Sequence, residues 1–108
     1  MKNFDHIENI LFDCDGVLYH QLDLVFGQVS KRMTEYISNK LNIDMQKAKE
    51  LQTNYFHKYN TSLNGLMIHH DIPPREFLDY VHDIDLSFLN KDKVLRNELE
   101  NIKLKKFV

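Results

Sequence analysis

Apolar residues recur three and four positions apart through most of the chain, which is the spacing of one buried face of an α-helix. This pattern predicts a long helix from Leu22 to about Asn42. Its apolar face would carry Leu22, Val25, Phe26, Val29, Met33, Tyr36, Ile37 and Leu41. Asp44 is expected to cap a second helix. The buried face of that helix would carry Met45, Ala48, Leu51, Gln52, Tyr55, Phe56 and Tyr59.

Three shorter helices are expected after these two. The first covers Thr61–His70, and the second begins at Pro73-Pro74, because proline suits the first turn of a helix. A fifth helix is expected from Asn90, as its cap, to Lys103. The apolar residues expected to face inward from these last two helices are Phe77, Leu78, Val81, Val94, Leu95, Leu99 and Ile102.

Two short segments are predicted to be strands. Ile10-Leu11-Phe12 is an apolar run that ends at Asp13-Cys14-Asp15-Gly16, as a buried parallel strand ends at a functional loop. Lys105-Lys106-Phe107-Val108 is read as the start of a second strand. The expected chain is therefore mostly α-helical, with one or two strands.

Composition narrows the class of protein. A chain of 108 residues with 43% hydrophobic and 28% charged residues is typical of one small globular domain. Its formal net charge of -2 offers no basic field for nucleic acid or an acidic membrane, so neither partner is expected. Cys14 is the single cysteine, and no apolar run suits a signal peptide or the roughly 20 residues of a spanning helix, so a cytoplasmic location is expected.

Asp13 and Asp15 are the candidate catalytic and metal-binding residues. Residues two apart at a strand end can point into one pocket, and Gly16 allows the sharp turn that would expose them. Asp13 could attack phosphorus while holding Mg²⁺, and Asp15 could give a proton to the leaving oxygen. The alternative is an acidic loop that caps the following helix.

The ten residues Ile10 to Tyr19 resemble the first motif of the haloacid dehalogenase superfamily of phosphatases, an apolar strand followed by Asp-x-Asp-Gly-Thr-Leu. Four further segments are similar to the cap of the pyrimidine 5'-nucleotidase branch: Tyr55 to Tyr59, Leu63 to Met67, His70 to Pro73 and Glu76 to Ile84. The resemblance implies an α/β fold by ancestry, a Rossmann-like core with a helical cap. Residues 1–18 would be the first core strand and catalytic loop, 19–88 the cap, and 89–108 a helix and the start of a second core strand.

The resemblance also implies roles for individual residues. Asp13 would be the nucleophile that forms an aspartyl-phosphate, and its carboxylate would bind Mg²⁺. Asp15 would be the general acid and base, with its backbone carbonyl as a further metal ligand. Val17 stands where the family usually has threonine. The implied substrate is a nucleoside monophosphate or another small phosphate ester.

The family's remaining motifs are not found in these residues. They are a Ser or Thr that grips the phosphate, a Lys or Arg, and further acidic metal ligands. The chain is therefore expected to be the amino-terminal half of such an enzyme and inactive alone. Two alternatives remain open: one half of a split enzyme completed by another chain, and a non-catalytic helical interaction module. An exposed strand edge would also allow self-association.

Other chemically suggestive residues receive structural interpretations. His57, His69, His70 and His82 lack the spacing of a zinc motif and are assigned no ligand role. Asp83 and Asp85 are expected to be solvated loop residues. The helical spacing of four aromatic residues predicts that they lie in the core and do not stack on a base: Tyr55, Phe56, Tyr59 and Phe77. The Lys103, Lys105 and Lys106 group is expected to complement a helix dipole.

Overall fold

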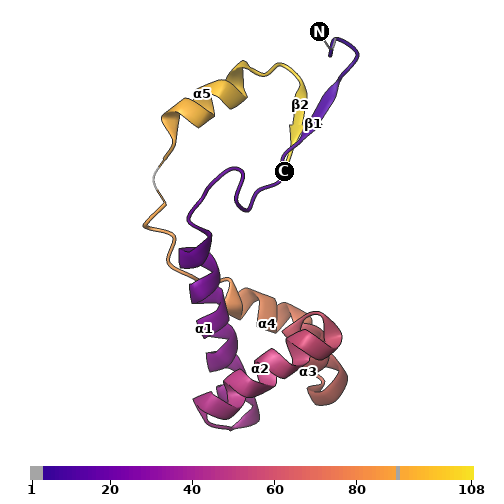
Figure 1. Ribbon diagram of the computed structural model, residues 1–108, viewed down its shortest axis with the longest axis vertical. Coiled ribbons are helices and arrows are strands. Elements are labelled where there is room, and N and C mark those ends of the chain that lie inside the picture. The colour runs from indigo at the N-terminus through magenta and orange to yellow at the C-terminus, as the bar shows by residue number, and fades with distance from the viewer. Residues whose placement is uncertain (1–3, 90) are drawn as a thin grey trace. The chain divides into compact units, whose positions relative to one another are not determined.

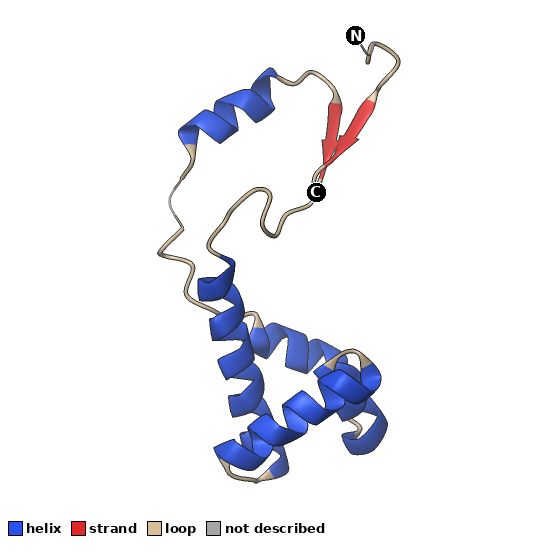
Figure 2. Cartoon of the chain, in the orientation of Figure 1, coloured by secondary structure: helices blue, strands red, loops and turns tan. Residues whose placement is uncertain are grey.

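The computed structural model describes residues 4–89 and 91–108, which form five helices and two short strands (Figures 1 and 2). In chain order the elements are β1 (Asn9–Leu11), α1 (Leu22–Leu41), α2 (Met45–Tyr59), α3 (Ser62–His70), α4 (Pro74–Val81), α5 (Lys93–Asn101) and β2 (Lys105–Phe107). The expectation of a mostly helical chain with one or two strands is confirmed, because two short strands are present. Over the same residues, every helix is too short or too polar to cross a membrane.

The chain divides into two compact units. Asp23–Asp85 forms one, called here the helical unit, and Met1–Leu22 with Leu86–Val108 forms the other, called the strand unit. The helical unit contains nearly all of α1 together with α2, α3 and α4. The strand unit contains β1, β2 and α5.

The core lies in the helical unit and is built from the apolar faces of its helices. The rings of Tyr36 and Phe77 pack in a T-shaped arrangement, with ring centroids 5.2 Å apart and an interplanar angle of 89°. Ile37, Leu66 and Val81 are completely buried. The buried apolar cluster consists of Val29, Tyr36, Ile37, Ala48, Leu66, Ile72, Phe77 and Val81.

The predicted starts of α2 and α3 are confirmed by capping hydrogen bonds. The Lys47 backbone N–H donates to Asp44 Oδ1 at 2.8 Å, and the Asn64 N–H donates to Thr61 Oγ1 at 3.1 Å. These bonds satisfy N–H groups that have no partner within the helix. α1 ends as predicted at Leu41, and Asn42 follows with a φ of 54°, in the left-handed region that commonly ends helices.

Both ends of the helical unit are tied together by one side chain. Gln28 Nε2, on α1, donates to the Asp85 carbonyl at 2.8 Å. In return, the Asp85 backbone N–H donates to Gln28 Oε1 at 2.9 Å. The carboxamide thus pairs with both backbone groups of Asp85, as a neighbouring strand would.

Four residues expected to face inward from α1, α2 and α4 are largely exposed. Phe26 is 51% exposed, Met45 46%, Phe56 55% and Leu78 40%. The helical period identifies the apolar side of α1, α2 and α4, but it contains no information on whether another element covers that side. Here the ends of these apolar faces remain open to solvent.

The fifth helix is shorter than predicted. It begins at Lys93, where Asp92 Oδ1 accepts a hydrogen bond from the Leu95 N–H at 2.9 Å. It ends at Asn101, before the predicted Lys103. Asn90, the predicted cap, lies outside the described residues. Because Asp92 supplies the cap, Val94 falls in the first turn and is 73% exposed, whereas it was predicted to be buried.

β1 and β2 form a parallel pair with Ile10 opposite Lys106. The pairing continues past the strands, because the Phe12 N–H donates to the Phe107 carbonyl at 2.9 Å. Parallel strands require a crossover connection, which here contains all five helices. Sheets of this kind are normally covered on both faces, yet Leu11 is 78% exposed and Phe107 45%.

Candidate functional site

The candidate site is the turn that follows β1. The Cys14 carbonyl accepts hydrogen bonds from the backbone N–H groups of Val17, at 3.3 Å, and Leu18, at 3.0 Å. Gly16, inside this turn, has a φ of +76°. A Cβ at this position would lie 3.3 Å from Leu22 Cδ1, so a larger residue would meet both backbone strain and a close contact. The glycine is therefore required by the turn itself.

Asp13 and Asp15 both lie on this exposed turn, at the carboxyl end of β1. This agrees with their predicted place at a strand end. Within residues 4–89 and 91–108, no cation pairs with the Asp13 carboxylate, which is therefore open to approach from solvent. The surroundings of Asp15 are different, because a tyrosine holds it.

Tyr19 bonds to Asp15 across the turn. Its Oη donates to Asp15 Oδ1 at 2.5 Å, and the two residues also form an isolated parallel bridge. This hydrogen bond to a carboxylate raises the pKa of Tyr19 to about 12, so the phenol stays protonated and remains a donor at neutral pH. Asp15 Oδ1 is thereby engaged by the Tyr19 hydroxyl, whereas this bond does not use Oδ2.

Sequence reasoning did not assign this role to Tyr19. Tyr19 lies within the motif, where it follows the apolar pair Val17-Leu18. That position alone gives no indication of a contact with Asp15. The available signal was its spacing: a residue four positions after Asp15, across a glycine turn, can fold back onto the aspartate. Spacing alone does not distinguish this contact from an exposed side chain.

The turn offers few of the oxygen ligands that Mg²⁺ needs. The described part of the chain holds no cluster of three or more His, Cys, Asp or Glu side chains that could bind a metal ion. Mg²⁺ prefers six oxygen ligands and is commonly held by one or two carboxylates, with waters and substrate phosphates completing the shell. Asp13 and Asp15 are the right kind of ligand, but they supply only the smaller part of such a shell.

Three of the four candidate histidines make hydrogen bonds inside the helical unit. His70 Nε2 lies 2.7 Å from Tyr55 Oη, and His69 Nε2 lies 2.5 Å from Tyr59 Oη. These pairs join α2 to α3, so both rings serve helix packing.

His82 Nδ1 lies 2.8 Å from the Leu78 carbonyl near the end of α4. Because a carbonyl can only accept, Nδ1 carries the proton in this contact.

Of the four aromatic residues that were predicted to lie in the core, Phe77 is buried there. Phe56 is exposed.

Two charged groups have contacts that refine their predicted roles. Asp83 is a solvated loop residue, as expected, with its side chain 85% exposed, and its Oδ2 also lies 3.6 Å from Arg32 Nη2. Lys106 Nζ donates to the Ile102 carbonyl at 2.6 Å, directly after α5. Lys106 therefore contacts a carbonyl at the negative end of a helix, in keeping with the predicted role.

A comparison of the sequence with models of known protein families finds no match. The turn after β1, with two exposed carboxylates, a glycine in the left-handed region and a tyrosine bonded to Asp15, is therefore the basis for assigning a function.

Proposed function

We propose that this chain supplies the nucleophile loop and the helical cap of a magnesium-dependent phosphohydrolase of the haloacid dehalogenase type, related to pyrimidine 5'-nucleotidases. The substrate would be a nucleoside monophosphate or another small phosphate ester in the cytoplasm. The main support is the position of Asp13 and Asp15 at the carboxyl end of a parallel strand, followed by Gly16 with a φ of +76°. In α/β proteins, ligands bind at the carboxyl ends of parallel strands.

The residues of the turn suit a two-step reaction. An Asp13 carboxylate oxygen attacks phosphorus and forms an aspartyl-phosphate, while protonated Asp15 gives its proton to the departing alcohol oxygen. Asp15, now a carboxylate, takes a proton from a water molecule that attacks the same phosphorus. The products are inorganic phosphate and a regenerated Asp13. Bound Mg²⁺ would neutralise charge on the phosphoryl group during both steps.

Tyr19 would act on this reaction through Asp15. Because its hydroxyl occupies Oδ1 of the carboxyl group, the proton is given and taken at Oδ2. The bond also restricts rotation of the Asp15 side chain. Tyr19 is therefore proposed as a positioning residue that does not touch the substrate.

The proposed reaction also needs groups that residues 1–108 do not supply. A phosphate clamp, a basic side chain and further metal ligands would have to come from other residues, in the same polypeptide or in another. Loss of one preorganised charge partner typically lowers the rate about 10²–10³-fold, and several are missing. We therefore expect the 108 residues to release very little phosphate.

Metal binding can be tested on these residues alone. We expect Mn²⁺, used as a paramagnetic substitute for Mg²⁺, to broaden the NMR signals of residues 13–19 selectively, and excess Mg²⁺ to reverse the broadening. Asp13→Asn should abolish the effect. Asp23→Asn, an exposed aspartate in the first turn of α1, is the matched control and should retain it. Uniform broadening, or equal loss in both variants, would contradict the proposal.

Catalysis requires a second measurement. Phosphate release from cytidine and uridine monophosphates and from p-nitrophenyl phosphate should be close to the blank for the chain alone. Mg²⁺-dependent turnover by the chain alone, absent in Asp13→Asn, would show that the 108 residues suffice and that the missing groups are not needed. The two results are independent, because weak metal binding does not require turnover.

A split enzyme is the second candidate, favoured by the exposed sheet. Leu11 is 78% exposed and Phe107 45%, so the parallel pair lacks the cover that such sheets normally have. A second polypeptide carrying the missing motifs would restore that cover and the site together. Co-expression followed by co-purification tests this, and light scattering separates it from self-association.

A non-catalytic interaction module remains the alternative outside enzymology. In that case Asp13→Asn would leave partner binding unchanged, and neither form would release phosphate in any assembly.

A further inference from the structure

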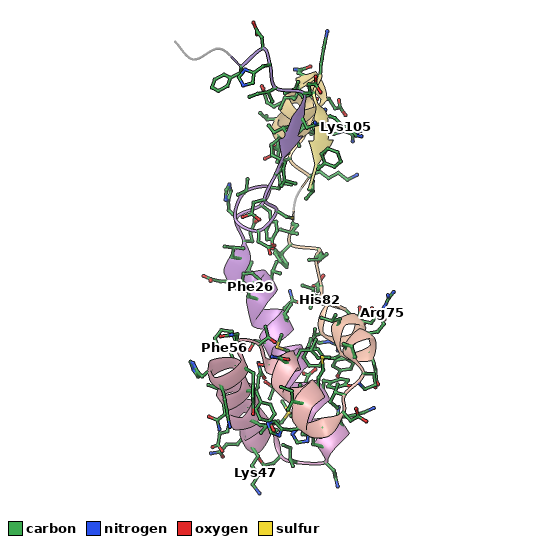
Figure 3. All side chains as sticks on the ribbon, turned by 90° about the vertical axis from the view of Figure 1, so that its right-hand side faces the viewer. Phe26, Lys47, Phe56, Arg75, His82 and Lys105 are labelled. Atoms are coloured by element: carbon green, nitrogen blue, oxygen red, sulfur yellow. The ribbon has the colours of Figure 1, made fainter. Side chains whose placement is uncertain are left out.

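The helical unit contains an apolar pocket that plays no part in the proposed reaction. Its volume is about 490 Å³, and it is lined by residues of all four helices of the unit. Phe77 and Val81 contribute to its lining and are 1% and 0% exposed. Figure 3 labels two exposed aromatic residues of the lining, Phe26 on α1 and Phe56 on α2.

The walls of this pocket are uncharged, since its lining includes no Asp, Glu, Lys or Arg. Its most buried polar side chains already have partners. Gln52 Oε1 accepts from Thr34 Oγ1 at 2.6 Å, and its Nε2 donates to Ser30 Oγ at 3.2 Å. Ser62 Oγ donates to the Gln52 carbonyl at 2.8 Å. A charged ligand would therefore lose its hydration without meeting an oppositely charged side chain.

His82 supplies a polar atom for recognition of a ligand. His82 lines the pocket and uses Nδ1–H to donate to the Leu78 carbonyl. In the neutral imidazole, Nε2 is then an acceptor. A ligand with one N–H or O–H group would match this atom.

We propose that the pocket binds a small, uncharged and mainly apolar molecule, of about the size of two or three fused or linked rings, with at most one hydrogen-bond donor. Its volume lies within the roughly 300–1,000 Å³ of typical small-ligand pockets, which are likewise mostly apolar with a few polar groups. A protein partner fits less well. The exposed apolar lining consists mainly of Phe26, Phe56 and Leu78, whereas a stable protein interface uses roughly 20–30 residues on each side.

N-phenyl-1-naphthylamine is a suitable probe, because it is neutral, apolar, has one N–H group and fluoresces strongly in apolar surroundings. We expect it to bind the full chain saturably with a stoichiometry of one. Phe26→Ala and Phe56→Ala each remove an aromatic wall and should weaken binding about ten- to hundredfold, as expected for loss of one buried aromatic contact. Both side chains are more than half exposed, so the fold should survive, which far-UV circular dichroism checks.

Leu24→Ala is the matched control. Leu24 also lies on α1 and is 54% exposed, but it does not line the pocket. Its replacement should leave the affinity unchanged. Equal weakening by Leu24→Ala and Phe26→Ala would show nonspecific adsorption to exposed apolar surface and would overturn the proposal.

A measurement on the unmodified chain makes the test independent of the variants. In a ¹H–¹⁵N NMR titration, the probe should shift the amide signals of Ser30, Thr53 and Leu78, which line the pocket, and leave Asn39 and Lys47, which do not, unaffected. Absence of saturable binding would overturn the proposal. Sedimentation would then show whether a second copy covers this face. The Mn²⁺ experiment on Asp13 does not involve this pocket, so either proposal can fail without the other.

Discussion

Gly65 on α3 allows the close packing of α2 against α3, and its replacement by alanine tests that packing directly. A Cβ at Gly65 would lie 2.4 Å from Cγ, 2.5 Å from Cβ and 2.7 Å from Cδ2 of Tyr55. All three distances are far below van der Waals contact, so the ring or the helix must move. Tyr55 resists such movement because its hydroxyl bonds to His70 at 2.7 Å and its ring stacks on His69 with centroids 5.4 Å apart.

Two opposing effects determine the size of the change. Overpacking a tight interior costs about 1–3 kcal/mol, and a ring held by two further contacts places this site at the upper end. Alanine in place of glycine in a helix recovers about 1 kcal/mol through its better helix propensity. We therefore expect Gly65→Ala to lower the free energy of unfolding by about 2 kcal/mol, which corresponds to a Tm roughly 10 °C lower for a unit of this size.

Gly27→Ala provides the matched control. Gly27 also lies within a helix, α1, but a Cβ there would meet nothing within 4 Å. Only the propensity effect remains, so this variant should be more stable than the unmodified chain by about 0.5–1 kcal/mol. Urea unfolding followed by far-UV circular dichroism measures both. If Gly65→Ala proves as stable as Gly27→Ala, α2 and α3 do not pack at the distance described.

Three further predictions address single hydrogen bonds. Asp44→Ala removes the cap of α2 and should lower the free energy of unfolding by about 1 kcal/mol in the same urea assay. An unchanged free energy would mean that water replaces the carboxylate as hydrogen-bond acceptor without loss of stability. Tyr19 should ionise near pH 12 in a spectrophotometric titration, because its pKa is raised by its bond to Asp15. The stabilisation from that bond is complete below pH 10 and is lost as the pH rises through about 12. Asp15→Asn removes the bond and should return the ionisation midpoint of Tyr19 toward pH 10. Thr34→Val leaves the buried Gln52 Oε1 without its donor and should lower the free energy of unfolding by about 1–3 kcal/mol. A decrease below about 0.5 kcal/mol in the urea assay would indicate that Gln52 finds another partner.

The helices of Asp23–Asp85 were predictable because each has a local cause. The apolar period defines α1, and the cap Asp44 marks the start of α2 within one residue. The exposure of Phe26 was not predictable, because it depends on whether another helix or strand packs over its side chain. The start of α5 was misplaced because Asn90 and Asp92 are both good capping residues and lie two positions apart.

The candidate site was predictable in its position but not in its contacts. An apolar run followed by Asp13, Asp15 and Gly16 placed the two carboxylates after a strand, and the structure agrees. The bond from Tyr19 to Asp15 depends on the path of the backbone through the turn, which sequence spacing does not define. The pairing of β1 with β2 was likewise beyond local reasoning, since it joins opposite ends of the chain.

The pairing of Gln28 with Asp85 has a consequence for the order of folding. β1 and β2 are separated by nearly the whole chain, so their association closes a very long loop. Once the helical unit has formed and Gln28 holds Asp85, the flexible chain left between the strands is less than half as long. Each halving of a loop lowers the entropic cost of closure by about 0.6 kcal/mol. We therefore expect the helices to act as a prefolded insertion that shortens the loop between two distant strands, and the sheet to be the last part to assemble.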